Sequence, residues 1–296
     1  MKKAIILLNM GAARSEKELR QFLFNMFMDK RIIDSPIRYL LAPYIALTRT
    51  KKVWKNYELI GGSRLYDITE SLSKKLSKET GLPVYYAMRY TTPRLHQILR
   101  ELDEAILLPM YPQYSTTTVE SSLDELKKIA FQGKLTIIPP FYNDLDFNRM
   151  IAHDIRKKIT RPAEHHLIFS AHGLPQEIID KGDPYEKQLQ EQIAILQKEL
   201  TGFKSIRLAF QSRFGNKPWL QPYLEDTLKQ LKGEKVVVYP ISFMIDNSET
   251  DLELKIEYAE KAKNLGLKDH QVISCPNDNL EIVSYLNQII QNYVSH

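Results

Sequence analysis

Short apolar runs alternate along the whole chain with segments whose apolar residues recur every three or four positions. The runs lie at 4–8, 84–88, 105–108 and 135–138 in the first half, and at 167–169, 206–210, 236–239 and 271–274 in the second. The helical spacing is clearest at 95–102, 119–130, 188–200 and 220–231. Strands that are apolar on both faces and alternate with helices are typical of parallel sheets covered on both sides. We therefore predict an α/β fold of two similar doubly wound domains, with a cleft between them.

The two halves meet near Pro139-Pro140, which the polar segment Tyr142-Asn143-Asp144 follows. With 296 residues the chain is long enough for two domains, which we place at 1–142 and 143–296. The pattern predicts a last helix within 280–296, and that helix could pack on either domain.

Segment 19–59 is more apolar and aromatic than a helix connecting two strands requires. Its apolar residues include Phe22, Phe24, Phe27, Tyr39, Leu40, Tyr44 and Ile45. The segment is either a helical pair packed on the sheet, or an apolar lip that covers a large flat ligand or faces a membrane. The cations that flank it are Arg31, Arg38, Arg49, Lys51 and Lys52.

Composition and charge narrow the possible partners and compartments. A net charge of +5 suits an anionic ligand or membrane surface. The cations are scattered without interleaved aromatic residues, so we expect no nucleic-acid partner. The single cysteine, Cys275, excludes a disulfide framework and suits the cytoplasm. The first apolar run ends at Asn9, too early for a signal peptide, and no run is long enough to span a membrane.

The strand at 167–169 ends in Ser170-Ala171-His172-Gly173-Leu174-Pro175. Gly173 allows a turn, and Pro175 prevents the strand from continuing. Ligands of open α/β sheets bind beyond the carboxyl ends of the strands, which is where His172 would lie. His172 is therefore either a turn residue or a ligand.

The strand at 236–239 leads to a predicted helix that begins near Asp246, Asn247 and Ser248, which are all good N-cap residues. Glu249, Glu253, Glu257 and Glu260 then share one helix face, beside a predicted buried stripe of Leu252, Ile256 and Ala259. The acidic face is either solvated or a path for protons or a divalent cation that leads to Glu249. One imidazole and one carboxylate suit weak, transient binding of iron or zinc.

Two further strand ends carry polar and aromatic side chains toward the same edge as His172. Tyr114 and Ser115 follow the strand at 105–108, and Gln211 and Trp219 follow the strand at 206–210. Each could bind a ligand or satisfy a local structural need.

Several blocks together resemble the signature motifs of the ferrochelatase family, in order and over nearly the whole chain. They are Leu8-Asn9-Met10-Gly11, Leu41-Ala42-Pro43-Tyr44-Ile45-Ala46, Arg89-Tyr90, Tyr111-Pro112-Gln113-Tyr114-Ser115, Phe169-Ser170-Ala171-His172-Gly173-Leu174-Pro175, Gly182-Asp183-Pro184-Tyr185, Gln211-Ser212-Arg213-Phe214-Gly215, Pro218-Trp219-Leu220, Pro240-Ile241-Ser242-Phe243 and Glu249-Thr250. The resemblance implies a lyase of two Rossmann-like, chelatase-type domains. It would insert Fe²⁺ into protoporphyrin IX, the last step of haem biosynthesis.

The resemblance also implies roles for particular residues. His172 and Glu249 correspond to the pair that takes the pyrrole protons, binds the metal, or does both, and Glu253 and Glu257 match the acidic line behind it. The implied substrate-binding residues are Met10, Arg49, Arg89, Tyr90, Tyr114, Ser115, Gln211 and Trp219. Among them, Met10 would lie over the opposite face of the ring, and Arg49 would bind propionates.

Departures from the family pattern qualify these roles. Asn247 stands where many members have His, and Lys255 replaces a common acidic residue and could pin part of the glutamate ladder. Ser63-Arg64 replaces Ser-Pro. Thr116 stands where members with a [2Fe–2S] cluster have a cysteine, so we predict no cluster and no tightly bound cofactor, with Fe²⁺ as a substrate.

The alternatives are a chelatase for another metal or tetrapyrrole, such as cobalt, zinc or coproporphyrin, and a porphyrin or haem carrier. We expect a monomer or weak dimer, in the cytoplasm or peripherally attached to the inner face of the membrane.

Overall fold

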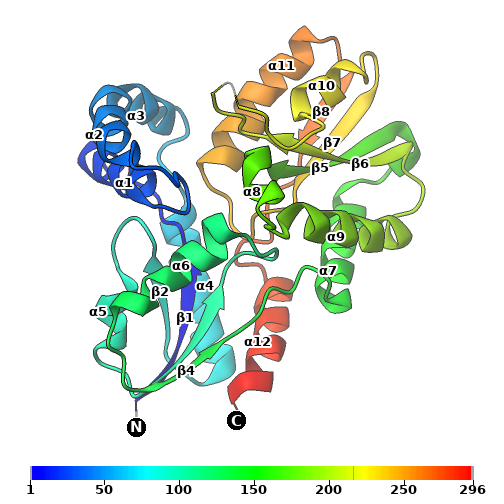
Figure 1. Cartoon of the computed structure of the whole chain (residues 1–296). Coiled ribbons are helices and arrows are strands. Elements are labelled where there is room, and N and C mark those ends of the chain that lie inside the picture. The colour runs from blue at the N-terminus through cyan, green and yellow to red at the C-terminus, as the bar shows by residue number, and fades with distance from the viewer. Residues whose placement is uncertain (1, 216, 295–296) are drawn as a thin grey trace. The chain divides into compact units, whose positions relative to one another are not determined.

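The computed structural model describes residues 2–215 and 217–294. Residues 1, 216, 295 and 296, which belong to segments named above, lie outside the described residues. The chain forms two compact units, one of Met1–Pro140 with Asn277–His296 and one of Phe141–Pro276 (Figure 1). The prediction of two four-stranded parallel sheets flanked by helices is confirmed.

The sheet of the first unit has the strand order β2-β1-β3-β4, and all its strands are parallel. The strands are β1 (Lys3–Asn9), β2 (Val84–Met88), β3 (Glu104–Pro109) and β4 (Lys134–Ile137). Ile5, Ile6 and Leu7 of β1 are fully buried, as a central strand covered on both faces requires. The helices around this sheet are α4 (Leu65–Thr80), α5 (Leu95–Leu99), α6 (Ser121–Asp124) and α12 (Leu280–Val294), with the single turns η1 (Thr116–Glu120) and η2 (Leu126–Lys128).

The last helix, α12, belongs to the first unit and packs against α4. Asp278, just before α12, accepts hydrogen bonds from Ser71 and Lys75 of α4. The sequence allowed either domain as its partner, and these contacts show which one it joins.

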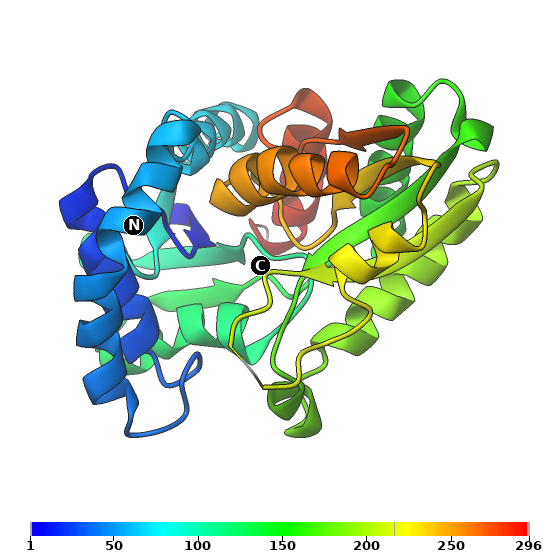
Figure 2. The ribbon, with the colours of Figure 1, turned by 90° about the horizontal axis from the view of Figure 1, so that it is seen from above.

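Segment 19–59 forms most of three helices, α1 (Glu16–Met28), α2 (Arg38–Thr48) and α3 (Thr50–Leu59), which Figure 2 shows at one side of the sheet of the first unit. They share a core in which Leu19 and Leu23 of α1 pack with Ala46 of α2 and Tyr57 of α3. Part of the apolar surface of the segment is therefore internal. The other part is exposed at Ile37, just before α2, and on α2 at Tyr39, Leu40, Tyr44 and Leu47.

The second unit repeats the arrangement of the first, with the strand order β6-β5-β7-β8. Its strands are β5 (His165–His172), β6 (Ser205–Gln211), β7 (Lys235–Pro240) and β8 (Asp269–Val272). Its helices are α7 (Leu145–Lys158), α8 (Gln176–Asp180), α9 (Tyr185–Glu199), α10 (Leu224–Lys229) and α11 (Tyr258–Asn264), with the turn η3 (Pro162–Glu164) and the wide helix η4 (Glu249–Glu257).

Two predicted helices are shorter or less regular than their apolar patterns indicated. In segment 220–231, Tyr223 still pairs with Phe210 of β6, so helix α10 begins only at Leu224. Segment 119–130 is divided among a π-helical turn, one α-helical turn and a 3₁₀ turn. The spacing of apolar residues indicates which residues face the core. It does not indicate whether a turn is α-, π- or 3₁₀-helical.

Candidate active site

The side chain of His172 lies at the carboxyl end of the central strand β5, where the residue pairs with Gln211 at the end of β6. Gly173 follows in a place with no room for a side chain, because a Cβ atom there would lie 2.8 Å from the carbonyl oxygen of Gln211. Only glycine fits here, where its N–H donates to the same oxygen at 2.9 Å, and β5 itself ends at His172. The imidazole is therefore presented at the sheet edge where ligands of such folds bind.

Glu249, the first residue of η4, faces this imidazole. Its Oε2 atom accepts hydrogen bonds from His172 Nδ1 at 2.8 Å, Ser212 Oγ at 3.1 Å and Gln211 Nε2 at 3.3 Å. The hydroxyl of Ser170 donates to Gln211 Oε1 at 2.6 Å, which turns the amide nitrogen of Gln211 toward Glu249. The structure thus brings His172, Glu249 and Gln211 together, as expected of residues at one sheet edge.

The charges of His172 and Glu249 stabilise each other. Burial lowers the pKa of His172, but the charge and hydrogen bond of Glu249 outweigh it, so the pKa lies above its usual 6.5. Burial raises the pKa of Glu249, but the charge and hydrogen bond of His172 outweigh it, so the pKa lies below 4.5. At pH values between the two pKa values, His172 is an imidazolium and Glu249 is a carboxylate. With 36% and 30% of their side chains exposed, both remain open to a ligand.

Glu253 is coupled to this pair through Ser212, whose backbone N–H donates to Glu253 Oε1 at 2.9 Å. The Ser212 hydroxyl lies 2.5 Å from Glu253 Oε2 and also contacts Glu249. Burial and then the charge of Glu249 raise the pKa of Glu253 to about 7. Near neutral pH, Glu253 can therefore hold or release a proton next to the His172–Glu249 pair.

The helix that carries these glutamates differs from the prediction, because residues 249–257 form a π-helix. The predicted buried stripe of Leu252, Ile256 and Ala259 was wrong, since Ile256 is 43% exposed. The buried positions are Thr250, Leu254, Tyr258 and Ala262, because the wider turns bring every fourth residue to the core side. Glu249 and Glu253 line the site, whereas Glu257 and Glu260 are exposed to solvent.

The start of the helix shows which of the predicted N-cap residues caps it, and where Lys255 binds. Ser248 precedes η4 without a capping hydrogen bond from its side chain, and Asn247 Oδ1 accepts from the N–H of Glu249 at 2.8 Å instead. Lys255 does not pin the glutamates. Its ammonium group binds Asp251 at 2.7 Å and Asp246 at 3.3 Å, and it thereby neutralises the carboxylate of Asp246, which is fully buried.

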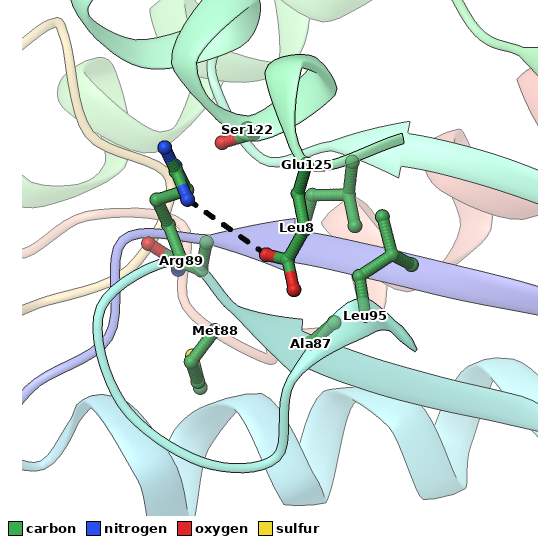
Figure 3. Close-up of a pocket in the computed structure, with 8 residues that line it drawn as sticks. Leu8, Ala87, Met88, Arg89, Leu95, Ser122 and Glu125 are labelled. Carbon is green, nitrogen blue, oxygen red and sulfur yellow. Dashed lines mark ion pairs between the residues drawn. The ribbon is translucent and has the colours of Figure 1, made fainter. Parts of the chain in front are cut away.

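Arg89 and Tyr90 lie at the end of β2 in the first unit and share the carboxylate of Asp29. Arg89 Nη2 lies 2.7 Å from Asp29 Oδ2, and the Tyr90 and Ser121 hydroxyls donate to the same oxygen at 3.1 and 2.6 Å. Figure 3 shows the guanidinium of Arg89 also directed toward Glu125, at 3.9 Å. Sequence reasoning did not identify Asp29. It holds Arg89 in place by an ion pair that is largely buried.

A cavity of about 510 Å³ opens beside Arg89 and Tyr90 within the first unit. Its lining is mainly cationic, with Lys30, Arg38, Arg89, Arg94, Lys127 and Lys128 against Asp29 and Asp124. This charge suits a ligand that carries carboxylates or another anionic group.

The other first-unit candidates have varied surroundings. Met10 is half-buried just after β1, and its carbonyl oxygen accepts from the N–H of Tyr90 at 3.0 Å. Arg49 is exposed between α2 and α3. Tyr114 donates to Glu120 at 3.1 Å. Ser115 is buried and caps the π-helical turn through the N–H of Thr117, which gives it a structural task.

Trp219 lies near His172 in the second unit. It pairs with Pro175 in an isolated bridge, and a side chain at Gly173 would approach its ring to 3.4 Å. Within the described residues, the buried indole Nε1–H has no hydrogen-bond partner. Trp219 therefore helps to hold the turn that follows His172.

No cluster of three or more His, Cys, Asp or Glu side chains within residues 2–215 and 217–294 is arranged to hold a metal ion. The His172–Glu249 pair alone has the donor set of a transient site, since stable structural sites normally provide four ligands. Among the described helices, none combines the length and apolar character needed to cross a membrane.

The family model described as ferrochelatase matches residues 2–294. The chain belongs to the ferrochelatase family. The ferrochelatase of Campylobacter concisus is 42% identical over 311 residues, covering 99% of this chain and 98% of the relative. The ferrochelatase of Wolinella succinogenes is 44% identical over 310 residues, covering 98% of both chains. Membership identifies the protein as a lyase that inserts a metal ion into a porphyrin.

Solved chelatase structures share the fold of this ferrochelatase-family member. SirB from Bacillus subtilis with Fe³⁺ has a TM-score of 0.61 at 10% identity, covering 99% of this chain and 95% of that one. CbiX, described as the terminal enzyme for the biosynthesis of sirohaem in denitrifying bacteria, has a TM-score of 0.58 at 12% identity, covering 99% and 100%. At these identities the likeness concerns the two Rossmann-like domains alone.

Proposed function

We propose that this ferrochelatase-family enzyme inserts Fe²⁺ into protoporphyrin IX, forms protohaem and releases two protons, and so completes haem biosynthesis. The observation that carries the proposal is the His172–Glu249 contact, with Glu253 behind it. Metallation must remove two N–H protons and deliver one dication. The site offers an imidazole nitrogen, a carboxylate and a second carboxyl group that titrates near pH 7.

In the proposed reaction, His172 and Glu249 act at the pyrrole nitrogens and Glu253 receives protons from them. Above its raised pKa, His172 loses the Nε2 proton of the imidazolium. Because Nδ1 donates to Glu249, the neutral imidazole then has its lone pair at Nε2. That lone pair can take a pyrrole proton or bind Fe²⁺. The exposed Glu257 would pass protons between Glu253 and solvent. Gln211 holds Glu249 in place through its amide.

For the porphyrin itself, we propose that its propionates meet the cationic residues of the first unit. The support is the lining of the cavity beside Arg89 and Tyr90. Arg49, Tyr114 and Met10 remain proposed contacts on the basis of the family motifs.

The test mixes the protein with protoporphyrin IX and Fe²⁺ without oxygen and follows the visible spectrum. We expect His172→Ala and Glu249→Gln each to slow metallation by roughly 10²–10⁴-fold, as the loss of an acid–base group does. His166→Ala, at the opposite end of β5, is the matched control and should retain activity. Unchanged metallation by His172→Ala would overturn the assignment of the site.

The same assay separates the alternative functions. Faster metallation with Zn²⁺ or Co²⁺, or with coproporphyrin in place of protoporphyrin IX, would identify a different chelatase. Binding of porphyrin without metallation would identify a carrier. The acidic group behind His172 favours catalysis, because a carrier needs an axial ligand but no proton acceptor.

We also propose that the enzyme binds peripherally to an anionic membrane surface, on the cytoplasmic side. The support is helix α2, whose apolar residues Leu40, Tyr44 and Leu47 are exposed although Ala42 and Ile45 already face its core. Lys51, Lys52 and Lys55 are exposed on the neighbouring helix α3. Apolar side chains flanked by lysines are typical of helices that lie on membranes.

Leu40 and Leu280 provide a matched pair for testing this attachment, because they are 77% and 79% exposed. We expect Leu40→Ser to weaken cosedimentation with anionic liposomes and Leu280→Ser to leave it unchanged. Equal binding by both variants would contradict the proposal. Phe22 and Phe24 are unsuitable for this test, because they pack on the core of the three helices.

We further propose a monomer or weak dimer without a [2Fe–2S] cluster or another tightly bound cofactor. The absence of a cluster is supported by composition, since Cys275 is the only cysteine and such a cluster usually needs four cysteine ligands. Iron analysis and the visible spectrum of the protein as isolated, with its elution volume in gel filtration, test these points.

A further inference from the structure

The backbone of His172 lies where the sheet ladder is interrupted. The N–H and C=O of one residue in a strand point to the same side, and those of the next residue point to the opposite neighbour. Gly173 donates to Gln211 of β6, so the backbone groups of His172 point toward β7. Pairing between β5 and β7 ends at Ser170 and Pro240, two residues before His172. No strand therefore remains to receive these groups.

Two buried hydroxyl groups replace the missing strand. The N–H of His172 donates to Ser242 Oγ at 3.1 Å, and the hydroxyl of Tyr185 donates to the carbonyl oxygen of His172 at 3.1 Å. Tyr185 is 6% exposed and Ser242 is 7% exposed. Removing either hydroxyl would leave a buried backbone group without a partner, which is a costly change.

The two hydroxyl groups hold His172 from both sides of its Cα atom, because one receives its N–H and the other donates to its carbonyl oxygen. Fixing both backbone groups of His172 fixes the direction in which its side chain leaves the strand. Burial raises the pKa of Tyr185, so its hydroxyl stays protonated and able to donate.

The Gly182-Asp183-Pro184-Tyr185 segment explains how Tyr185 reaches this position. Gly182 has φ +95°, a left-handed conformation that permits the turn between α8 and α9. Asp183 Oδ1 then accepts from the N–H of Tyr185 at 3.0 Å, at the first residue of α9. The turn places the Tyr185 ring inside the unit, with its hydroxyl at the end of β5.

We infer that Tyr185 and Ser242 are positioning residues, which hold the backbone of His172 so that its imidazole meets Glu249 in the geometry that metallation needs. The two sequence motifs that contain Tyr185 and Ser242 would therefore support the reaction without contacting the substrates. The inference rests on the proposed role of His172. It predicts that loss of either hydroxyl disturbs the imidazole more than the fold.

The test compares Tyr185→Phe and Ser242→Ala, which each remove one oxygen atom, with Tyr285→Phe, a buried tyrosine on α12. We expect kcat to fall about tenfold in the first two variants, with the KM for porphyrin changed less than about twofold, because misplacing a reacting group slows the chemical step. Tyr285→Phe should retain the kcat of the wild type.

An NMR titration with labelled histidine measures the pKa of His172 without any turnover of substrate, and His172→Gln assigns its signal. We expect its pKa to fall toward the usual value in Tyr185→Phe and Ser242→Ala, because the contact with Glu249 that raises it is weakened. If Tyr185→Phe does not fold, Ser242→Ala tests the same positioning through the N–H of His172.

A folded variant with the pKa of His172 and the kcat of the wild type would overturn the inference. A different result, full activity of His172→Ala, would contradict the proposed role of His172. The two failures are therefore distinguishable.

Discussion

Glu253→Gln should stabilise the second unit, and the gain should increase with pH. Burial and the neighbouring charge of Glu249 raise the pKa of Glu253 from 4.5 to about 7. The unfolded chain thus loses this proton at lower pH than the folded chain does. Between those two values the folded state binds more protons, so the stability of the wild type falls as the pH rises.

The size of the effect follows from the shift. At about 1.4 kcal/mol per pKa unit the cost of ionising Glu253 reaches roughly 3 kcal/mol above pH 7, and partial solvent exposure reduces it to about 2–3 kcal/mol. Glutamine has the shape of the protonated acid and can keep the hydrogen bond from the N–H of Ser212. It cannot ionise, so the variant should avoid that cost.

The assay is urea unfolding followed by the fluorescence of Trp219 in a Trp54→Phe background, which makes the signal specific to the second unit. We expect similar stabilities at pH 4.5 and an advantage for Glu253→Gln of about 2 kcal/mol or more at pH 8. Glu257→Gln, at the exposed glutamate of the same helix, is the control and should show no such gain. An advantage that is equal at both pH values would refute the reasoning.

Three further changes test other contacts. Gly173→Ala should destabilise the second unit by about 1–3 kcal/mol in urea, because its Cβ would lie 2.8 Å from a backbone oxygen. Arg89→Met should destabilise the first unit by about 3–5 kcal/mol, monitored by circular dichroism, because it leaves the buried carboxylate of Asp29 without its cationic partner. The stability lost in His172→Gln should be largest between pH 4.5 and 6.5. It should shrink as the pH rises through the raised pKa of His172 or falls through the lowered pKa of Glu249. Unchanged midpoints, or a loss in His172→Gln that is independent of pH, would contradict these expectations.

The elements that could be predicted from sequence are those that strand periodicity determines. Central strands such as β1 and β5 are buried on both faces, so their apolar runs are continuous and their ends are marked by Asn9 and by Gly173. The ends of neighbouring parallel strands converge, which is why the proximity of His172, Gln211 and the segment before Glu249 could be anticipated.

The features that sequence did not reveal depend on side-chain geometry in three dimensions. The π-helix at 249–257 has glutamates at the same four-residue spacing as an α-helix, so its width is invisible in the pattern. Asp29 looks like an ordinary residue after a helix, and only the folded chain shows Arg89, Tyr90 and Ser121 around it. Lys255 was assigned to the wrong carboxylates because spacing does not tell which side of a helix faces a buried aspartate.

A count of protons at Ser212 links the structure to the proposed reaction. The hydroxyl carries one proton, yet it lies within hydrogen-bond distance of both the Glu249 and the Glu253 carboxylates. If both were ionised, one of these contacts would place two acceptors together without a proton between them. A protonated Glu253 resolves this, because it donates to Ser212, which in turn donates to Glu249. The raised pKa of Glu253 is therefore what this bonding pattern requires. In the proposed reaction, Glu253 first releases this proton toward solvent. A proton taken from the porphyrin by the His172–Glu249 pair can then move to the ionised Glu253 by reversing the donors along the same line of oxygens.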